Sequence, residues 1–317
     1  MRAEQSYDIF SFKMPPDRTT RATTLRRAFR SAAPPETITQ EAHEGNPKHL
    51  RRLARLRPGD LAEVGDLWEY MQDLLYTEIQ GPLLAYVIPF CLEAWREDLR
   101  GTSSDYGGFV EHFYPVLANR QVFDRHLTAA QAAAVSEFMR ESILDEIDDQ
   151  RGLTYSGSGA RPYRWIRALT THGVLLPDLG ALWIAWWSVA TTGRAIAAEQ
   201  YASCLMYPQN ENPIFAPWTS EKGGGPPCLW EFAGHLYTNR WMKENVRFLK
   251  QTLSPKAVAE ILSQAVNRLA GQPEYGVAAE LQSDIPFCAE TLAARCAELP
   301  NLLEKTGESG SMREWSI

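Results

Sequence analysis

Residues 254–271 read SPKAVAEILSQAVNRLAG, and this stretch predicts an amphipathic α-helix. Ser254 is a favourable N-cap, and Pro255 suits the first helical position, where a missing N–H costs no hydrogen bond. Gly271 supplies the stop, because glycine readily adopts the left-handed conformation that ends many helices. The apolar residues between these ends recur at intervals of three and four: Val258, Ile261, Leu262, Ala265, Val266 and Leu269. A helix with one apolar face must pack against other elements, so this stretch already indicates a helical protein.

Similar signals begin helices elsewhere in the chain. Thr128 and Gln131 have the spacing of a capping box and open a helix whose apolar face extends over residues 135–147. Asp284, with Pro286 just behind it, predicts the start of another helix, which carries two leucines toward the C-terminus. Each of these helices again has one apolar face, so we expect them to pack together.

The most apolar part of the chain lies between residues 173 and 190. Proline, aspartate and glycine interrupt it early, so it is too short for a membrane span, which needs about 20 apolar residues. We expect a central helix between Asp178 and Leu205. Trp183, Trp186 and Trp187 share one stripe with leucines, so core packing explains these tryptophans better than a ligand or carbohydrate site.

Earlier in the chain, residues 67–79 and 82–99 predict a pair of helices split at Gly81-Pro82. Pro89 lies inside the second member, where it removes a hydrogen bond and should kink or divide the helix. The only strand candidate is residues 7–12, which is too short to carry a sheet. The expected fold is therefore all-α, an irregular multi-helix array or stack of helix pairs in two packed halves.

Three stretches lack helical periodicity and predict breaks. Residues 46–60 are basic, residues 151–162 combine small and polar residues with glycine, and residues 208–227 form a long loop rich in proline and glycine. Long irregular loops within compact regions are uncommon and are often functional. The expected organisation is an N-terminal arm over 1–22, a helical domain over 23–150, a linker over 151–162, a second helical domain over 163–304 and a flexible tail over 305–317.

Charge is distributed unevenly along the chain. Residues 1–60 hold 12 Lys and Arg against 7 Asp and Glu, whereas the remaining residues hold 20 against 32. The basic residues concentrate at Arg26, Arg27 and Arg30 and between Lys48 and Arg57. One interpretation is that this segment docks on the acidic body of the same chain. A nucleic-acid contact by residues 48–57 is the alternative, although it requires a continuous basic face.

Cysteine usage and the N-terminus suggest a cytoplasmic protein. The five cysteines are scattered, with no Cys-x-x-Cys pair, so neither a disulfide framework nor a cysteine zinc site is expected. The first residues, MRAEQSYDIF, contain no apolar signal region. Phosphate-loop, dinucleotide, nucleophile-elbow and HExxH motifs are absent from the sequence, so no cofactor and no metal are expected.

Glu231 and His235 form the first candidate for chemistry. If the segment behind the long loop is helical, residues four apart share a face, so a carboxylate and an imidazole could act as an acid–base couple or bind a metal. A hydrogen bond on the helix surface, or a partly buried histidine, explains the same pair without any activity. Trp230 lies beside them, as a residue lining a pocket would.

Trp218 is the candidate for a protein contact, because it lies in the loop 208–227 and exposed tryptophans are common interface anchors. A second polar cluster, Glu111, His112, Asp124 and His126, precedes the capped helix. Adjacent residues such as Glu111 and His112 diverge by about 100° on a helix and cannot grip one atom together, so we expect a structural role.

Part of the sequence resembles a small uncharacterised family of bacterial helical proteins. The similarity covers about residues 24–150 and follows the order AFRSAAPPETIT, DLWEYMQDLLYTEIQGPLLAYVIPFCLEAW and HLTAAQAAAV. Its motif residues serve helix packing and capping, and the family carries no known activity or catalytic residues to transfer. The matching positions are Phe29, Pro34, Pro35, Leu84, Tyr86, Pro89, Leu127, Thr128, Gln131, Ala134 and Val135.

Two functional hypotheses follow from the sequence. The first is a protein-binding module, for example an immunity or accessory protein that sequesters a toxin or effector; an acidic helical body and a long loop bearing Trp218 fit it. The second is an enzyme whose site lies between the halves, with Glu231 and His235 as acid–base or metal-binding groups. The missing catalytic motifs favour the first hypothesis.

Overall fold

A computed structural model places residues 254–271 as the sequence predicts. They form α13 (Pro255–Leu269), and Ser254 Oγ accepts a hydrogen bond from the Ala257 N–H at 3.2 Å. Gly271 has φ +79°, the left-handed conformation expected just beyond a helix end. The capping box is confirmed as well, since Thr128 and Gln131 bond each other's backbone N–H groups at the start of α7.

The structure describes residues 24–57, 60–101, 107–119, 122–153, 161–176, 178–207, 212, 214 and 242–305. Within these ranges every regular element is a helix, and the helices account for more than half of the whole chain, which confirms the all-α fold. The strand candidate at residues 7–12 lies outside the described residues. Besides the helical residues 24–28 and α13, the helices are α2 (Lys48–Leu53), α3 (Val64–Tyr76), α4 (Gly81–Arg100), α5 (Gly107–Asn119), α6 (Val122–Arg125), α7 (Ala129–Asp148), α8 (Arg161–Leu175), α9 (Leu179–Trp187), α10 (Thr192–Met206), α12 (Lys243–Thr252), α14 (Tyr275–Ser283) and α15 (Ala289–Lys305).

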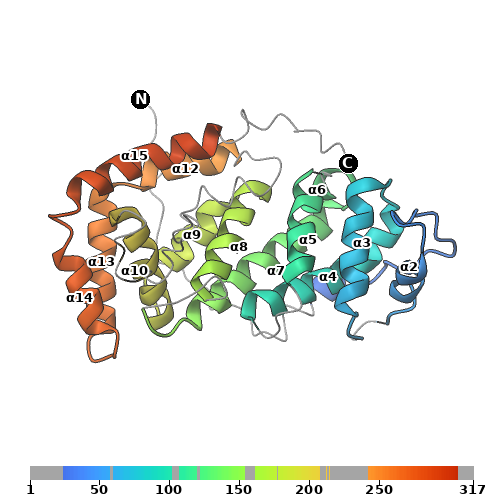
Figure 1. Ribbon diagram of the computed structural model, residues 1–317, viewed down its shortest axis with the longest axis horizontal. Coiled ribbons are helices and arrows are strands. Elements are labelled where there is room, and N and C mark those ends of the chain that lie inside the picture. The colour runs from blue at the N-terminus through green and yellow to red at the C-terminus, as the bar shows by residue number, and fades with distance from the viewer. Residues whose placement is uncertain are drawn as a thin grey trace.

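The helices form an elongated row along the long axis of the molecule (Figure 1). In this view α3 packs beside α5 at one end, α7 beside α8 in the middle, and α10 beside α13 toward the other end. Helices α12 and α15 lie together across the top of the C-terminal half. Buried apolar side chains from Leu25 to Leu299 form one continuous core along this row. Among the described residues, no helix combines the length and apolarity required to cross a membrane.

Helix α10 is the centre of the C-terminal half, because every residue from Gly193 to Met206 is buried. Its first turn touches the end of α7. A Cβ atom at Gly193 would lie 2.3 Å from the Asp148 carbonyl oxygen, so only glycine allows this approach. Arg194 adds a two-pronged contact to the Asp148 carboxylate, with N–O distances of 2.8 and 2.9 Å. The acidic run Asp145, Glu146, Asp148 and Asp149 at the end of α7 is typical of a solvated face in the sequence. The structure differs, because Asp148 is paired with Arg194 and Glu146 is buried.

The expected central helix between residues 178 and 205 is two helices, α9 and α10. The chain turns at Val189, which has φ +45°, and a new helix begins behind Thr191. Thr191 Oγ1 accepts a hydrogen bond from the Arg194 N–H at 3.2 Å, so this threonine is an N-cap. The division is a correction to the sequence prediction, since the apolar stripe continues across the turn.

The predicted helix start at Asp284 is wrong. Asp284 ends α14, and the next helix, α15, begins five residues later at Ala289. The Asp284 carboxylate does not cap a helix, because its Oδ2 accepts a hydrogen bond from the Tyr207 hydroxyl at 2.5 Å. The two expected leucines, Leu292 and Leu299, are buried on α15 as the apolar pattern indicates.

The helix pair around Gly81-Pro82 is confirmed by α3 and α4. Helix α4 remains continuous through Pro89, so the proline does not divide it. Pro89 has no N–H to offer, which leaves the Ala85 carbonyl without its helical donor. The stretch 46–60, expected to be irregular, contains the short helix α2, which buries one face against α3.

Aromatic residues fill the region between α8, α9 and α10. Trp183 and Trp186 are buried and pack edge-on against Tyr201, with ring centroids 5.4 and 5.6 Å away. Trp187 joins the same cluster at 5.7 Å from Tyr201. The prediction that these tryptophans belong to the core is confirmed.

Of the cysteines, Cys91, Cys204, Cys288 and Cys296 lie in the described residues, and all four are free thiols. Cys288 is half-buried and the other three are buried. Burial raises the pKa of the Cys91 thiol, and it raises the pKa of Cys296 to about 11. These two thiols therefore remain protonated near neutral pH.

Candidate functional site

All four residues that the sequence singles out for function lie outside the described residues: Glu231, His235, Trp218 and Trp230. The structure neither brings them together nor separates them. From the second polar cluster, His112 packs edge-on against Trp68, with ring centroids 5.4 Å apart. Within the described residues, polar contacts are dense at the N-terminal end of the helical row.

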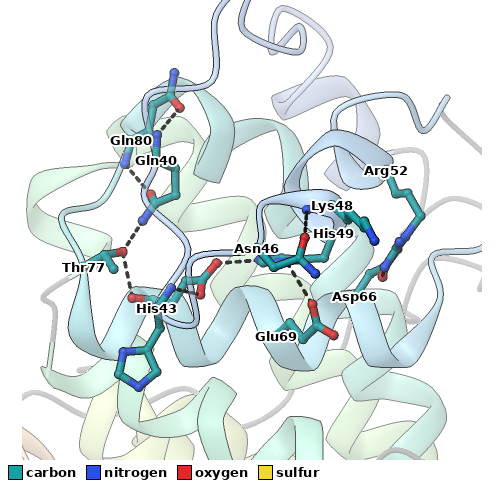
Figure 2. Close-up of polar contacts among 11 residues, drawn as sticks. Gln40, His43, Asn46, Lys48, His49, Arg52, Asp66, Glu69, Thr77 and Gln80 are labelled. Carbon is teal, nitrogen blue, oxygen red and sulfur yellow. Dashed lines mark hydrogen bonds and ion pairs between the residues drawn. The ribbon is translucent and has the colours of Figure 1, made fainter.

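A buried histidine fastens α2 to α3 (Figure 2). His49, on α2, is only 2% exposed, and its Nε2 lies 2.5 Å from Asp73 Oδ2 on α3. Glu69 Oε2, one turn earlier on α3, lies 2.9 Å from the other ring nitrogen, although this ion-pair contact is not aligned as a hydrogen bond. Asp73 Oδ1 also accepts the His43 N–H at 2.7 Å. A histidine enclosed in this way cannot reach a substrate in solution, so the cluster holds helices together.

Two glutamines extend the network to the start of α4 (Figure 2). Gln80 donates its backbone N–H to Gln40 Oε1 at 2.9 Å, and Gln40 donates its own to Gln80 Oε1 at 3.2 Å. The Gln80 side-chain amide also donates to the Thr37 carbonyl at 2.8 Å, and Gln40 Nε2 donates to Thr77 Oγ1. The two glutamine side chains thus bond backbone groups that have no helical partner. These bonds fix residues 37–43 against the turn between α3 and α4.

The end of α2 and the chain that follows it are held in place by three further contacts. Arg52 forms a two-pronged ion pair with Asp66 on α3, as Figure 2 shows. The Tyr86 hydroxyl of α4 donates to the Leu56 carbonyl, and the Arg57 N–H donates to Asp60 Oδ2 at 2.6 Å. Burial, followed by the nearby Asp60 charge, raises the pKa of Tyr86. Part of the basic N-terminal region thus contacts acidic residues of the same chain, and these contacts place Asp60 beside α4.

A groove opens between residues 25–32, Asp60 and α4, and we call it the N-terminal groove. Its volume is about 110 Å³. For comparison, an engineered apolar cavity of roughly 150 Å³ admits benzene, so this groove can take one aliphatic side chain. Apolar side chains make its floor, and two arginines and two carboxylates stand among its walls. The lining residues are Leu25, Arg26, Phe29, Arg30, Ala32, Asp60, Tyr86, Pro89, Phe90 and Glu93.

Some of the charged side chains around the groove have partners within the chain, and others do not. Glu93 is paired with Arg96, and one oxygen of Asp60 accepts a backbone N–H. Arg26 and Arg30 are exposed, and neither makes an ion pair with any residue that the structure describes. Arg26 belongs to the helical residues 24–28 and Arg30 to the turn behind them, and both line the groove. The groove can therefore bind an apolar side chain and, beside it, a carboxylate.

The N-terminal groove is not among the sites that the sequence indicates. Phe29, Tyr86 and Pro89 are residues of the family resemblance, where they were assigned to packing, and the structure brings all three to one groove. The available signal was the pair Arg26 and Arg30 on either side of Phe29. The sequence alone does not show that this segment lies against the middle of α4.

One buried acid lies apart from the groove, on α10. Glu199 is 0% exposed, and neither of its carboxylate oxygens has a hydrogen-bond partner in the part of the chain that the structure describes. Burial raises the pKa of this carboxyl to about 9, so it is protonated at neutral pH. A neutral acid enclosed within the core affects stability.

Searches of protein-family models, curated proteins and solved structures found no significant match for this chain. Among the described residues, no group of three or more His, Cys, Asp or Glu side chains is placed to hold a metal ion.

Proposed function

We propose that the protein is a protein-binding module and that the N-terminal groove is its contact surface. The observation that carries this proposal is the combination of an apolar floor with two exposed arginines that make no ion pair among the described residues. Protein interfaces combine an apolar centre with a polar rim and are enriched in aromatic residues and arginine. Phe29, Tyr86 and Phe90 supply the aromatic part of this groove.

The surroundings of the groove support the proposal. Two lining residues are held in place: Asp60 Oδ2 accepts the Arg57 N–H at 2.6 Å, and the Tyr86 hydroxyl donates to the Leu56 carbonyl, so this part of the groove is preorganised. Preorganisation lowers the entropic cost of binding. In its narrower form, the proposal is that the partner is a toxin or effector, which the protein holds inactive as an immunity or accessory protein.

Site-specific photo-crosslinking tests the proposal in cells. A benzophenone amino acid replaces Ala33, which is exposed and adjoins the groove residue Ala32. We expect ultraviolet light to produce one reproducible adduct with another protein, which mass spectrometry identifies. The control places the same amino acid at Phe287, an equally exposed position between α14 and α15, and should not give this adduct.

A second variant ties the adduct to the groove. Ala32→Trp fills the cavity with a large ring, so it should abolish the adduct at position 33. With the identified partner purified, the same substitution should weaken binding at least about tenfold while the helical circular dichroism is unchanged. An adduct that persists when the cavity is filled would show that the groove is not the contact surface.

A further inference from the structure

Leu61 is the most exposed large apolar residue in the described part of the chain, at 93% of its surface. A single exposed leucine is ordinary on a protein surface. Leu61, however, directly follows Asp60, which lines the N-terminal groove, so an exposed leucine is the next residue along the chain from the groove.

The residues around Leu61 complement the groove in charge. Residues 60–63 read Asp-Leu-Ala-Glu, and both carboxylates are exposed. Glu63 makes no ion pair with the described residues, and neither do Arg26 and Arg30 beside the groove. An apolar side chain with acidic neighbours is the chemistry that the groove suits, and the protein itself displays such a segment.

Size and symmetry agree with this assignment. The groove volume of about 110 Å³ suits one aliphatic side chain of the size of leucine. Because Leu61 adjoins a groove residue in the chain, two copies related by a two-fold axis can each insert a leucine into the other. Such an isologous contact closes on itself and gives a dimer rather than a chain of molecules.

We propose that a second copy of this chain occupies the N-terminal groove, with Leu61 of each copy inserted into the other and Glu63 facing Arg26 and Arg30. This inference rests on the proposed function, because it assigns an occupant to the same surface. It also implies regulation: a protein partner must displace the second copy, so self-association keeps the groove closed until the partner is abundant.

Sedimentation over a concentration series tests the dimer, from about 1 µM to about 1 mM, the range in which weak interfaces associate. We expect the intact protein to pass from monomer to dimer, and Leu61→Ser to raise the dissociation constant at least about tenfold. Leu61 contacts little of its own chain, so this variant should keep the parent melting temperature. Phe287→Ser removes an equally exposed ring at the other end of the molecule and should leave the dimer unchanged.

Charge exchange provides the sharper test. The double variant Arg26→Glu/Arg30→Glu places acidic residues opposite the acidic segment, and Glu63→Arg places a basic residue opposite the arginines. Each should be monomeric alone. An equal mixture should form heterodimers, because opposite charges then meet at both contacts of the two-fold pair. This recovery cannot arise from misfolding of either variant.

A protein that stays monomeric throughout the series would overturn the inference, as would a dimer that survives Leu61→Ser or variants that do not recover on mixing. These results leave the proposed function separate. If the position-33 adduct with another protein still forms and is lost in Ala32→Trp, the groove binds a different partner and only the second copy is excluded.

Discussion

At the scale of single residues, Glu199 is an acid whose surroundings disfavour its charged form. Its carboxyl group is fully buried on α10 with no hydrogen-bond partner among the described residues. An ionised carboxylate is very costly in such a place, so the group keeps its proton, and burial raises its pKa to about 9. The native protein therefore keeps the Glu199 proton up to a much higher pH than the unfolded chain does.

The consequence is a stability that falls as pH rises. Between the ordinary pKa of a glutamate, 4.5, and about 9, the native protein holds a proton at Glu199 that the unfolded chain has lost. The free energy of unfolding should therefore decline across this window. We expect Glu199→Gln to flatten the decline, measured by urea unfolding at pH 6 to 8.5. Glu260→Gln, on the exposed face of α13, is the matched control and should keep the parent slope.

At the scale of elements, helix starts that depend on neighbouring residues could be predicted. Ser254 and Thr128 cap their helices with atoms three residues away, so the sequence displays both partners at once. Thr191 was missed because the apolar stripe of α9 extends to the turn and hides the break. Asp284 misled for a different reason: its carboxylate is taken by Tyr207, which is distant in sequence. A residue type and its near neighbours can thus indicate a helix cap, but contacts with distant residues determine whether that residue caps a helix.

The same distinction explains why the site could not be predicted. The N-terminal groove joins Arg26 and Arg30 to Pro89 and Phe90, residues about 60 positions apart that no local pattern connects. The pairing of His49 with Asp73 is equally non-local. One contact agrees with the interpretation that the basic N-terminal segment docks on acidic residues of its own chain, since Arg52 pairs with Asp66. The sequence did not show which basic residues would be left for a partner.

Gly193 tests how closely α7 and α10 approach. In an ordinary helix, replacing glycine with alanine stabilises the protein by roughly 0.5–1 kcal/mol. A Cβ at Gly193, however, would lie 2.3 Å from the Asp148 carbonyl and 2.5 Å from that of Ile147. We therefore expect Gly193→Ala to lower the free energy of unfolding by about 1–3 kcal/mol in urea titrations. Gly276→Ala in α14, where nothing lies within 4 Å, should be neutral or stabilising; equal effects would mean that the helices can separate at little cost.

At the scale of the whole molecule, Arg194 of α10 pairs with Asp148 of α7 across the segment 151–162, and the start of that segment is itself held to the C-terminal half. The Gly152 N–H donates to Glu274 Oε1 at 2.7 Å, and Gln200 Nε2 donates to the Gly152 carbonyl at 3.2 Å. The buried apolar side chains also form one continuous cluster from end to end. The halves should therefore lose their structure together.

Calorimetry can measure this coupling. We expect a single transition, with the calorimetric enthalpy equal to the van't Hoff enthalpy. Leu67→Ala in α3 and Leu262→Ala in α13 each remove a fully buried side chain, at a cost of about 2–5 kcal/mol, and both should shift the whole transition downward. A transition that splits, with each variant moving only one part, would show that the halves unfold independently.

Because the thiols lie in different parts of the chain, their rates of chemical labelling report local unfolding in each part. An alkylating reagent attacks thiolates, so among the four described thiols Cys288, which is half-buried, should react first. Cys91 in α4 and Cys296 in α15 react only when their surroundings open, since burial keeps both protonated. Mass spectrometry of labelled peptides over time thus measures the rate of local opening around Cys91 and around Cys296 separately. A partner that closes the N-terminal groove should slow the labelling of Cys91 and leave Cys296 at its former rate.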